Sequence, residues 1–360
     1  MKNEKNELLY LTVYNSLKED IISGAYAFKD KLPSKRVTAD RFGVSLITVE
    51  HAYDLLLSEG YVEAKERSGY YSSYSNGDGF LSVVNNEKEK DVAKVTSNTV
   101  NNFPISLYSK AARKVLSEYK EKIFTKCDIF GCETLRYELS KYLKRTRNMF
   151  VEDDQIVIGA GAEYLYGLIA ELFGNKISVG IEKPSYEKIE KAYKSKGIKV
   201  EYLELGNDGI ESRFLNSCRS DIIHITPYRS YPSKISASPS KRNEYLRWAK
   251  SRQGYIIEDD YESEFCISGK VYDTLYSMSA NDDVIYINTF SKTISSGIRI
   301  AYLVLPNKLK TLFSQKLSFY SCAVPTLDQL ILAEILKSGE FNRNINRIRR
   351  KLKQNLDAKT

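Results

Sequence analysis

One lysine in this sequence stands in a setting that could do chemistry on a carbonyl group. Lys292 follows the strand-like run VIYI in a Thr-x-Ser-Lys context, and Arg299 lies seven residues further on. Upstream, the string YIIEDDYESEF at 255–265 begins apolar and then breaks into carboxylates. A lysine amine can attack an aldehyde, a carboxylate can stabilise a cationic nitrogen, and a guanidinium with hydroxyls can hold a phosphate. Pyridoxal phosphate requires all three of these groups.

The strings INTFSKTISSGIRIAYLVLP and EDDYESEF resemble those of fold type I aminotransferases, and EDDYESEF together with TFSK resembles the MocR subgroup of regulators. The resemblance implies pyridoxal 5'-phosphate as the cofactor, with Lys292 forming the Schiff base. It assigns Asp259 to the pyridine nitrogen and Tyr261 to the ring hydroxyl. Thr289, Ser291 and Arg299 are assigned to the phosphate. The match runs, with gaps, from Phe103 to the C-terminus.

Two further stretches match the same family. GAGAEYLYGL at 159–168 is similar to its turn into a helix, where the amides of Gly161, Ala162 and Glu163 would receive the phosphate. Tyr186, in EKPSY, matches the aromatic residue that stacks on the cofactor ring. A lone lysine after a strand is usually a surface residue, and carboxylates at strand ends are often solvated. The prediction therefore depends on the whole set occurring in order.

The resemblance fails in two places. TPYRSYPSKIS at 226–236 puts Arg229, Ser230 and Lys234 where the family commonly has His, Gln and Gly, which predicts an altered pocket wall. The last helix matches the one that leads into the small C-terminal domain of relatives, and no arginine can be assigned to the clamp for a substrate carboxylate. We expect a truncated product, and the alternative is a natural short form whose basic last helix faces solvent or a partner.

A different pattern precedes this region. Apolar residues recur at helical spacing from Tyr10 to Ser23, Ser34 and Ser45 are N-cap candidates for two more helices, and YVEAKERSGYYSSY has the alternation of a hairpin. Three helices followed by a hairpin, with a Gly-Val-Ser turn between the second and third helices, is the layout of a winged helix-turn-helix.

The strings LPSKR at 32–36, VSLITV at 44–49 and EGYVE at 59–63 resemble the GntR family of regulators. The resemblance implies an operator in double-stranded DNA as the partner. The residues that it places at the DNA are Ser34, Arg36, Ser45, Ile47, Thr48, Lys65, Arg67 and Gly69. Taken singly, both serines could be only helix caps and Arg36 only a solvated charge. Where the family often has an arginine for guanine, this chain has Leu46, which predicts a different operator preference.

The sequence thus predicts two domains, a GntR-type winged helix-turn-helix (α+β) at 1–74 and an aminotransferase-like domain at 103–360. The polar stretch 75–102 between them has the composition of a linker. In the second domain, helical patterns such as 132–147 and 163–173 alternate with strand-like runs, which favours an α/β fold with a mainly parallel sheet. Those runs are at 156–158, 177–181, 222–226, 255–259, 284–288 and 300–305.

Net charge does not identify the DNA-binding part. The chain carries a formal charge of +8, but residues 1–75 hold 10 basic and 11 acidic residues, whereas 337–360 holds eight basic and two acidic ones. Five scattered cysteines without CxxC spacing and two histidines predict neither disulfides nor a metal site. Without an apolar run long enough for a membrane or a signal peptide, we expect a cytoplasmic protein with no membrane contact.

Three functions remain open at this point. The leading hypothesis is a homodimeric transcription regulator in which a small amine or amino-acid effector reacts at the cofactor and changes how the winged helices bind DNA. The second is an aminotransferase with a DNA-binding appendage, although the unassigned carboxylate clamp argues against turnover. The third is a DNA-binding protein whose second domain has lost its cofactor, which the departures at 226–236 favour.

Overall fold

The computed structural model describes residues 2–65, 68–74, 103–266 and 273–357. The chain divides into two compact units, Met1–Val95 and Thr96–Thr360. The predicted linker at 75–102 lies outside the described residues. None of the described helices is both long enough and apolar enough to cross a membrane.

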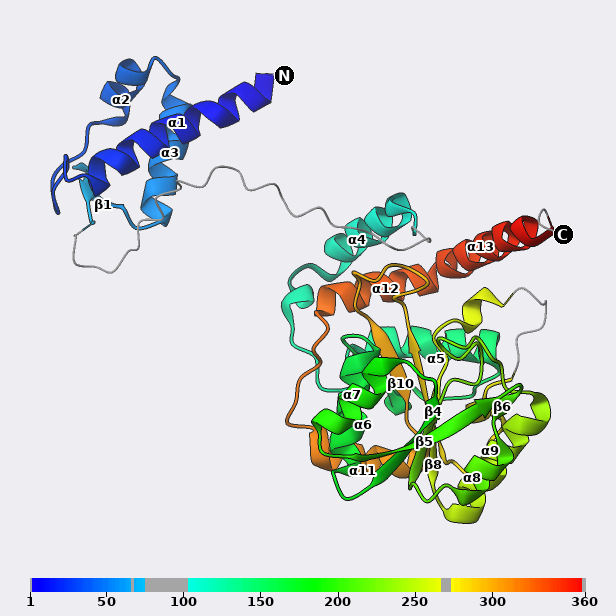
Figure 1. Cartoon of the computed structure of the whole chain (residues 1–360). Coiled ribbons are helices and arrows are strands. Elements are labelled where there is room, and N and C mark those ends of the chain that lie inside the picture. The colour runs from blue at the N-terminus through cyan, green and yellow to red at the C-terminus, as the bar shows by residue number, and fades with distance from the viewer. Residues whose placement is uncertain (1, 66–67, 75–102, 267–272, 358–360) are drawn as a thin grey trace. The chain divides into compact units, whose positions relative to one another are not determined.

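The N-terminal unit is a small helical domain with one hairpin (Figure 1). Its elements are α1 (Lys2–Ile22), α2 (Lys35–Phe42), α3 (Leu46–Ser58), β1 (Val62–Lys65) and β2 (Gly69–Ser72). A core that includes Leu17, Tyr53 and Leu56, all fully buried, holds the three helices together. Helix α1 begins earlier than the predicted Tyr10, because residues 2–7 are all polar and carry no apolar periodicity that would reveal a helix.

The second unit contains an eight-stranded sheet among its described residues, in the order β3-β10-β9-β8-β7-β4-β5-β6. The neighbours from β9 to β5 pair in parallel, whereas β10 is antiparallel to both β3 and β9. The mainly parallel sheet is therefore confirmed. The strands are β3 (Ile156–Gly159), β4 (Ser178–Lys183), β5 (Lys199–Gly206), β6 (Gly209–Ile210), β7 (Ile222–Ile225), β8 (Tyr255–Asp259), β9 (Val284–Thr289) and β10 (Ala301–Val304).

Helices cover both faces of this sheet, as Figure 1 shows. One face packs against α6 (Ala162–Phe173), α7 (Glu187–Ser195) and α11 (Asn307–Leu317). The other face packs against two groups of helices. They are α4 (Ile105–Tyr119), α5 (Glu133–Arg147), α12 (Thr326–Lys337) and α13 (Glu340–Asp357), and α8 (Ser212–Ser217), α9 (Pro239–Arg252) and α10 (Leu275–Met278). Short 3-10 turns complete the unit at η1 (Lys120–Phe124), η2 (Asp153–Gln155) and η3 (Ser263–Phe265).

Because the strands are buried on both faces, they are nearly continuous apolar runs, and this is why the sequence identified most of them. Strand β5 was not predicted. It carries Lys199, Glu201 and Glu204 near the sheet edge, where half-exposed side chains dilute the apolar signal.

Candidate functional site

The site lies where several strands end at the same edge of the sheet. Strands β8 and β9 are parallel, so Asp259 and Thr289, their last residues, lie at the same edge. Strand β10 is antiparallel to both β9 and β3, so β3 runs in the same direction as β9 and also ends here, at Gly159. In open α/β sheets this carboxyl edge is the usual position of a ligand.

A cavity of about 410 Å³ opens at this edge. Nine of the residues that the sequence assigned to a cofactor line it, and only Gly161 of that set does not. The nine are Ala162, Glu163, Tyr186, Asp259, Tyr261, Thr289, Ser291, Lys292 and Arg299. Residues from 162 to 299 thus meet around one space, which the sequence could predict only through the family resemblance.

Asp259 lines the cavity and is buried, with 4% of its surface exposed. The hydroxyl of Tyr166 donates a hydrogen bond to its Oδ2, and His224 Nε2 lies 3.7 Å from the same oxygen. The other oxygen, Oδ1, is buried without a hydrogen-bond partner among the described residues. A buried carboxylate oxygen without a partner is costly, so this atom is suited to accept a hydrogen bond from a cationic ring nitrogen.

His224 is itself held in place from behind. It lies on β7 in register with Ile257 of β8, and its Nδ1 is 2.8 Å from the hydroxyl of Tyr193 on α7. Burial raises the pKa of Tyr193 well above its ordinary value, so this phenol stays neutral. The sequence gave His224 no role beyond excluding zinc, because the pairing of β7 with β8 is what brings it to Asp259.

The start of α6 supplies one wall of the cavity. Gly161 is the N-cap residue of this helix and has φ +98 and ψ 165, a region that only glycine adopts easily. A Cβ atom here would lie 2.3 Å from Nη2 of Arg299. The guanidinium therefore packs directly on this glycine, close to the first amides of the helix. Helix N-termini with an adjacent arginine are common binding sites for phosphate.

Another part of the wall comes from the end of β9 and the loop that follows it. Thr289 Oγ1 donates to Ser291 Oγ at 3.0 Å and accepts from the Ser291 amide at 3.2 Å. These hydroxyls face the same cavity as Arg299. Lys292 has 54% of its side chain exposed, and its Nζ lies 3.8 Å from Oε1 of Glu262. The amine is thus accessible from the cavity.

Two tyrosines complete the predicted set. The hydroxyl of Tyr261 donates to the carbonyl of Arg229 at 3.1 Å, and burial raises its pKa above the ordinary value. Tyr186 is the N-cap residue of α7, and its ring meets that of Tyr231 edge-on at a centroid distance of 6.0 Å. Tyr231 was not predicted, although it lies in the string that departs from the family pattern.

The string 226–236, which departs from the family pattern, includes two residues with positive φ. Arg229 and Lys234 adopt φ values of +53 and +59, so Lys234 takes the left-handed conformation at a position where relatives commonly have glycine. Ser230 is buried and donates a hydrogen bond to Oε2 of Glu182 at 2.5 Å. Burial raises the pKa of Glu182 to about 8. Arg229, Ser230 and Lys234 do not line the cavity, so these three side chains do not alter its wall as predicted.

Cavity-lining residues outside the predicted set are Tyr166, Lys188, Ile189, Thr226, Tyr231 and Ser296. The sequence could have indicated two of these residues by their spacing from predicted ones. Tyr166 lies three residues after Glu163, so both lie on the same face of α6. Lys188 follows the predicted Tyr186 by two residues at the start of α7.

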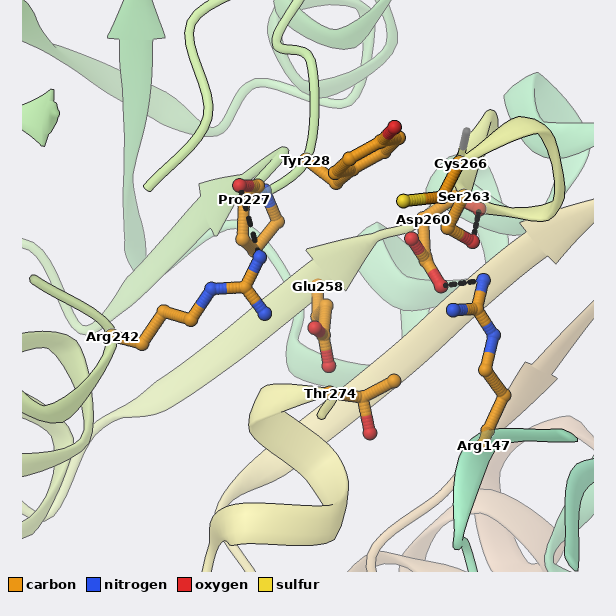
Figure 2. A pocket seen from close by; sticks show the side chains of 9 residues that line it. All are labelled: Arg147, Pro227, Tyr228, Arg242, Glu258, Asp260, Ser263, Cys266 and Thr274. Carbon is orange, nitrogen blue, oxygen red and sulfur yellow. Dashed lines mark hydrogen bonds and ion pairs between the residues drawn. The ribbon is translucent and has the colours of Figure 1, made fainter. Parts of the chain in front are cut away.

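A separate polar cluster surrounds a second, smaller cavity next to Asp260, directly after β8 (Figure 2). Arg147 Nη2 is 2.7 Å from Asp260 Oδ2, and the Tyr286 hydroxyl donates to the same oxygen at 2.7 Å. The cavity between these groups measures only about 10 Å³, enough for roughly one water molecule. The cluster therefore fixes the end of β8 and is too small for a ligand. Among the described residues, no group of His, Cys, Asp and Glu is arranged for a metal ion.

The predicted DNA-facing residues gather at two helix starts of the N-terminal unit. Ser34 caps α2 by accepting from the Val37 amide, and Ser45 caps α3 by accepting from the Thr48 amide at 3.2 Å. Thr48 is 6% exposed, and its hydroxyl lies 2.8 Å from that of Ser45. Ser34 thus shapes the start of α2, and Ser45 and Thr48 shape the start of α3.

The exposed residues of this region are of a different kind. Ile47 is 66% exposed and Leu46 is 47% exposed at the start of α3. Exposure of these two neighbouring apolar side chains does not stabilise the folded domain. Arg36 is exposed on α2. Lys65 ends β1, with its Nζ 3.2 Å from Glu63, and Gly69 begins β2 with φ +115. The other predicted wing residue, Arg67, lies outside the described residues.

Two family models match different parts of the chain. Residues 9–71 match the family of bacterial regulatory proteins called gntR, and residues 90–358 match aminotransferase class I and II. An uncharacterized HTH-type transcriptional regulator of Bacillus subtilis (strain 168), YdeL, is 30% identical over 95% of this chain and 76% of its own length. The chain belongs to the MocR-type gntR regulators.

Other relatives of this MocR-type chain agree. The probable rhizopine catabolism regulatory protein MocR of Rhizobium meliloti is 24% identical, over 95% of this chain and 74% of its own length. The crystal structure of Pyrococcus horikoshii kynurenine aminotransferase superposes with a TM-score of 0.65, covering 73% of this chain and 68% of that chain at 22% identity. At that identity the superposition establishes the fold alone.

Proposed function

We propose that this MocR-type chain is a DNA-binding transcription regulator that uses pyridoxal phosphate and responds to a small amine or amino acid. The observation that carries the cofactor half is the free Oδ1 of buried Asp259 in the wall of a cavity that Lys292 and Arg299 also line. The family match of residues 9–71 supports the DNA half.

The residues present fit the cofactor. Asp259 would accept from the pyridine nitrogen, and Tyr166 and His224 would keep its other oxygen occupied, so that the carboxylate has one fixed orientation. Tyr186 would cover the ring, and Tyr261 would contact the ring hydroxyl. The phosphate would be held by the amides of Gly161, Ala162 and Glu163, by the hydroxyls of Thr289 and Ser291, and by the Arg299 guanidinium.

When bound, the cofactor supplies an aldehyde for amines and a ring that withdraws electrons. Lys292 would provide the amine that holds the aldehyde carbon. Glu262 Oε1 lies 3.8 Å from this amine, so its carboxylate would stabilise a positive charge there. An amine effector would bind at the same position as the Lys292 amine, next to Glu262. Release of Lys292 would free the loop that follows β9, and this change would be passed to the DNA-binding unit of a homodimer.

The cofactor assignment is tested with Lys292→Ala in the full chain, with Lys310→Ala as the control. Lys310 pairs with Asp154 on the surface and does not line the cavity. After incubation with pyridoxal phosphate and removal of free cofactor, wild type and Lys310→Ala should keep the visible absorbance of lysine-bound cofactor. Lys292→Ala should lose it. If Lys292→Ala retains the same absorbance, the lysine assignment is wrong.

The DNA half is tested with Arg36→Ala against Arg41→Ala. Both are on α2, but Arg41 is in the last turn, where its Nη1 lies 3.5 Å from Asp20 of α1. Loss of one phosphate contact should weaken binding to operator DNA and lower the slope of log affinity against log salt by about 1. Arg41→Ala should leave the slope unchanged. Equal slopes for wild type and Arg36→Ala would remove Arg36 from the interface.

A second function, amino-acid transamination, is favoured by the match of residues 90–358 to aminotransferase class I and II. It predicts steady conversion of an amino acid and a keto acid by the purified chain. One spectral change per site upon addition of an amine, without product, would support regulation instead.

A further inference from the structure

A carboxylate of this chain lies among the groups that the proposed function gives to the phosphate. Glu163 is in the first turn of α6 and lines the cavity. Its Oε1 accepts from Lys188 Nζ at 2.6 Å, and its Oε2 accepts from Arg299 Nη2 at 3.0 Å. One negative group thus bridges two cations that come from α7 and from the loop before β10.

The electrostatics show that this carboxylate is bound as an anion. Burial by itself would raise the pKa of Glu163, but hydrogen bonds from Lys188, from the Glu163 backbone amide and from Arg299 outweigh it and lower the pKa to about 2. The amide in this set belongs to the N-terminus of α6. The carboxylate therefore uses a cation and a helix amide that also suit a phosphate.

The backbone holds Arg299 toward this position. Arg299 has φ +49, an uncommon conformation for a residue with a side chain. Its Nη2 also donates to the carbonyl of Ala160 at 3.1 Å and packs on the bare backbone of Gly161. Nη2 of the guanidinium thus already has two acceptors, Ala160 and Glu163, so a phosphate that binds to Nη2 must replace one of them.

We propose that the Glu163 carboxylate is an internal competitor for the cofactor's phosphate. To bind a phosphate on Arg299 and the α6 amides, the chain must release Glu163 Oε2 from Arg299 and move the side chain aside. Lys188 lies in the cavity wall next to the same carboxylate and either follows it or joins the phosphate. This exchange forms and breaks only ion pairs and hydrogen bonds, and it limits affinity for phosphorylated ligands. The inference rests on the proposed cofactor site.

The test uses Glu163→Gln in the full chain, which removes the charge but keeps the size of the side chain. The matched control is Glu171→Gln, since Glu171 is on the same helix, pairs with Lys196 and does not line the cavity. The probes are pyridoxal phosphate, pyridoxal without its phosphate, and inorganic phosphate as a competitor. Melting curves confirm that each variant is folded, and Glu163→Ala is the second variant if the first is not.

We expect Glu163→Gln to bind pyridoxal phosphate about tenfold more tightly, equivalent to about 1.4 kcal/mol. Inorganic phosphate should compete better by a similar factor, whereas affinity for pyridoxal should not change. Equal or weaker binding of pyridoxal phosphate by Glu163→Gln and Glu163→Ala, with wild type still binding it, would overturn the competitor role and leave the cofactor site intact. If none of the proteins binds pyridoxal phosphate, the proposed function itself fails.

Discussion

Replacing Gly161 by alanine perturbs the phosphate side of the proposed site at a single point. The new methyl group would be built 2.3 Å from Nη2 and 2.7 Å from Cζ of Arg299, far inside van der Waals contact. The backbone at φ +98 and ψ 165 cannot relieve this contact, because alanine is itself strained there. The guanidinium is the flexible partner, so it must move away from the start of α6.

Two effects of different size follow. Backbone strain in this region costs about 1–3 kcal/mol of folding stability. Loss of a charge-assisted hydrogen bond from Arg299 to the phosphate costs a further 1.5–3 kcal/mol or so, but only in binding. Affinity for pyridoxal phosphate should therefore fall by roughly 10- to 150-fold. Affinity for pyridoxal, which lacks the phosphate, should change little.

The assay is titration of the visible absorbance of bound cofactor, together with thermal melting. Gly167→Ala is the matched control, because Gly167 is on the same helix, and a Cβ there would meet nothing within 4 Å. Alanine inside a helix should raise stability by about 0.5–1 kcal/mol and leave affinity unchanged. Equal loss of affinity for pyridoxal and pyridoxal phosphate in Gly161→Ala would refute the reasoning, since the damage would then not concern the phosphate.

Two other substitutions test the buried groups near the cavity. Burial raises the pKa of Glu182 to about 8, so the folded chain keeps a proton that the unfolded chain releases near pH 4.5, and stability falls as pH rises through that interval. The melting temperature of Glu182→Gln should depend less on pH and should exceed the wild-type value at pH 8 and above, because glutamine can still accept the hydrogen bond from Ser230. If the melting temperatures of the two proteins change with pH in parallel, Glu182 is not neutral in the folded chain. Tyr166→Phe removes the hydrogen bond to Asp259 and should cost about 1.5–3 kcal/mol in denaturant unfolding. Tyr164→Phe on the same helix serves as its control. If Tyr166→Phe and wild type unfold at the same denaturant concentration, the hydrogen bond from Tyr166 to Asp259 does not stabilise the chain.

Much of the architecture followed from short-range patterns. The caps at Ser34 and Ser45 and the six apolar runs of the large sheet were placed within a residue or two of the observed elements. Caps are local hydrogen bonds, and strands buried on both faces are apolar along their length, so both are visible in a few consecutive residues. Strand β5 was missed because half-exposed charged residues interrupt its pattern.

The site shows the limit of that reasoning. Asp259, Lys292 and Arg299 could be named in advance because each lies in a recognisable string. Their partners could not. His224 reaches Asp259 only because β7 pairs with β8, and Tyr166 does so because α6 packs on that face of the sheet.

By itself, the sequence determined the order of the two units, the strand edge that carries the acid and the lysine, and the family to which these strings are similar. Only the tertiary structure decided which ion pairs and hydrogen bonds surround these residues. Glu163 lies between Lys188 and Arg299, and Oδ1 of Asp259 has no hydrogen-bond partner among the described residues. Ser230 donates its hydrogen bond to Glu182 and does not line the cavity. These outcomes depend on distances between residues far apart in the chain, and electrostatic interactions are set by those distances and by burial.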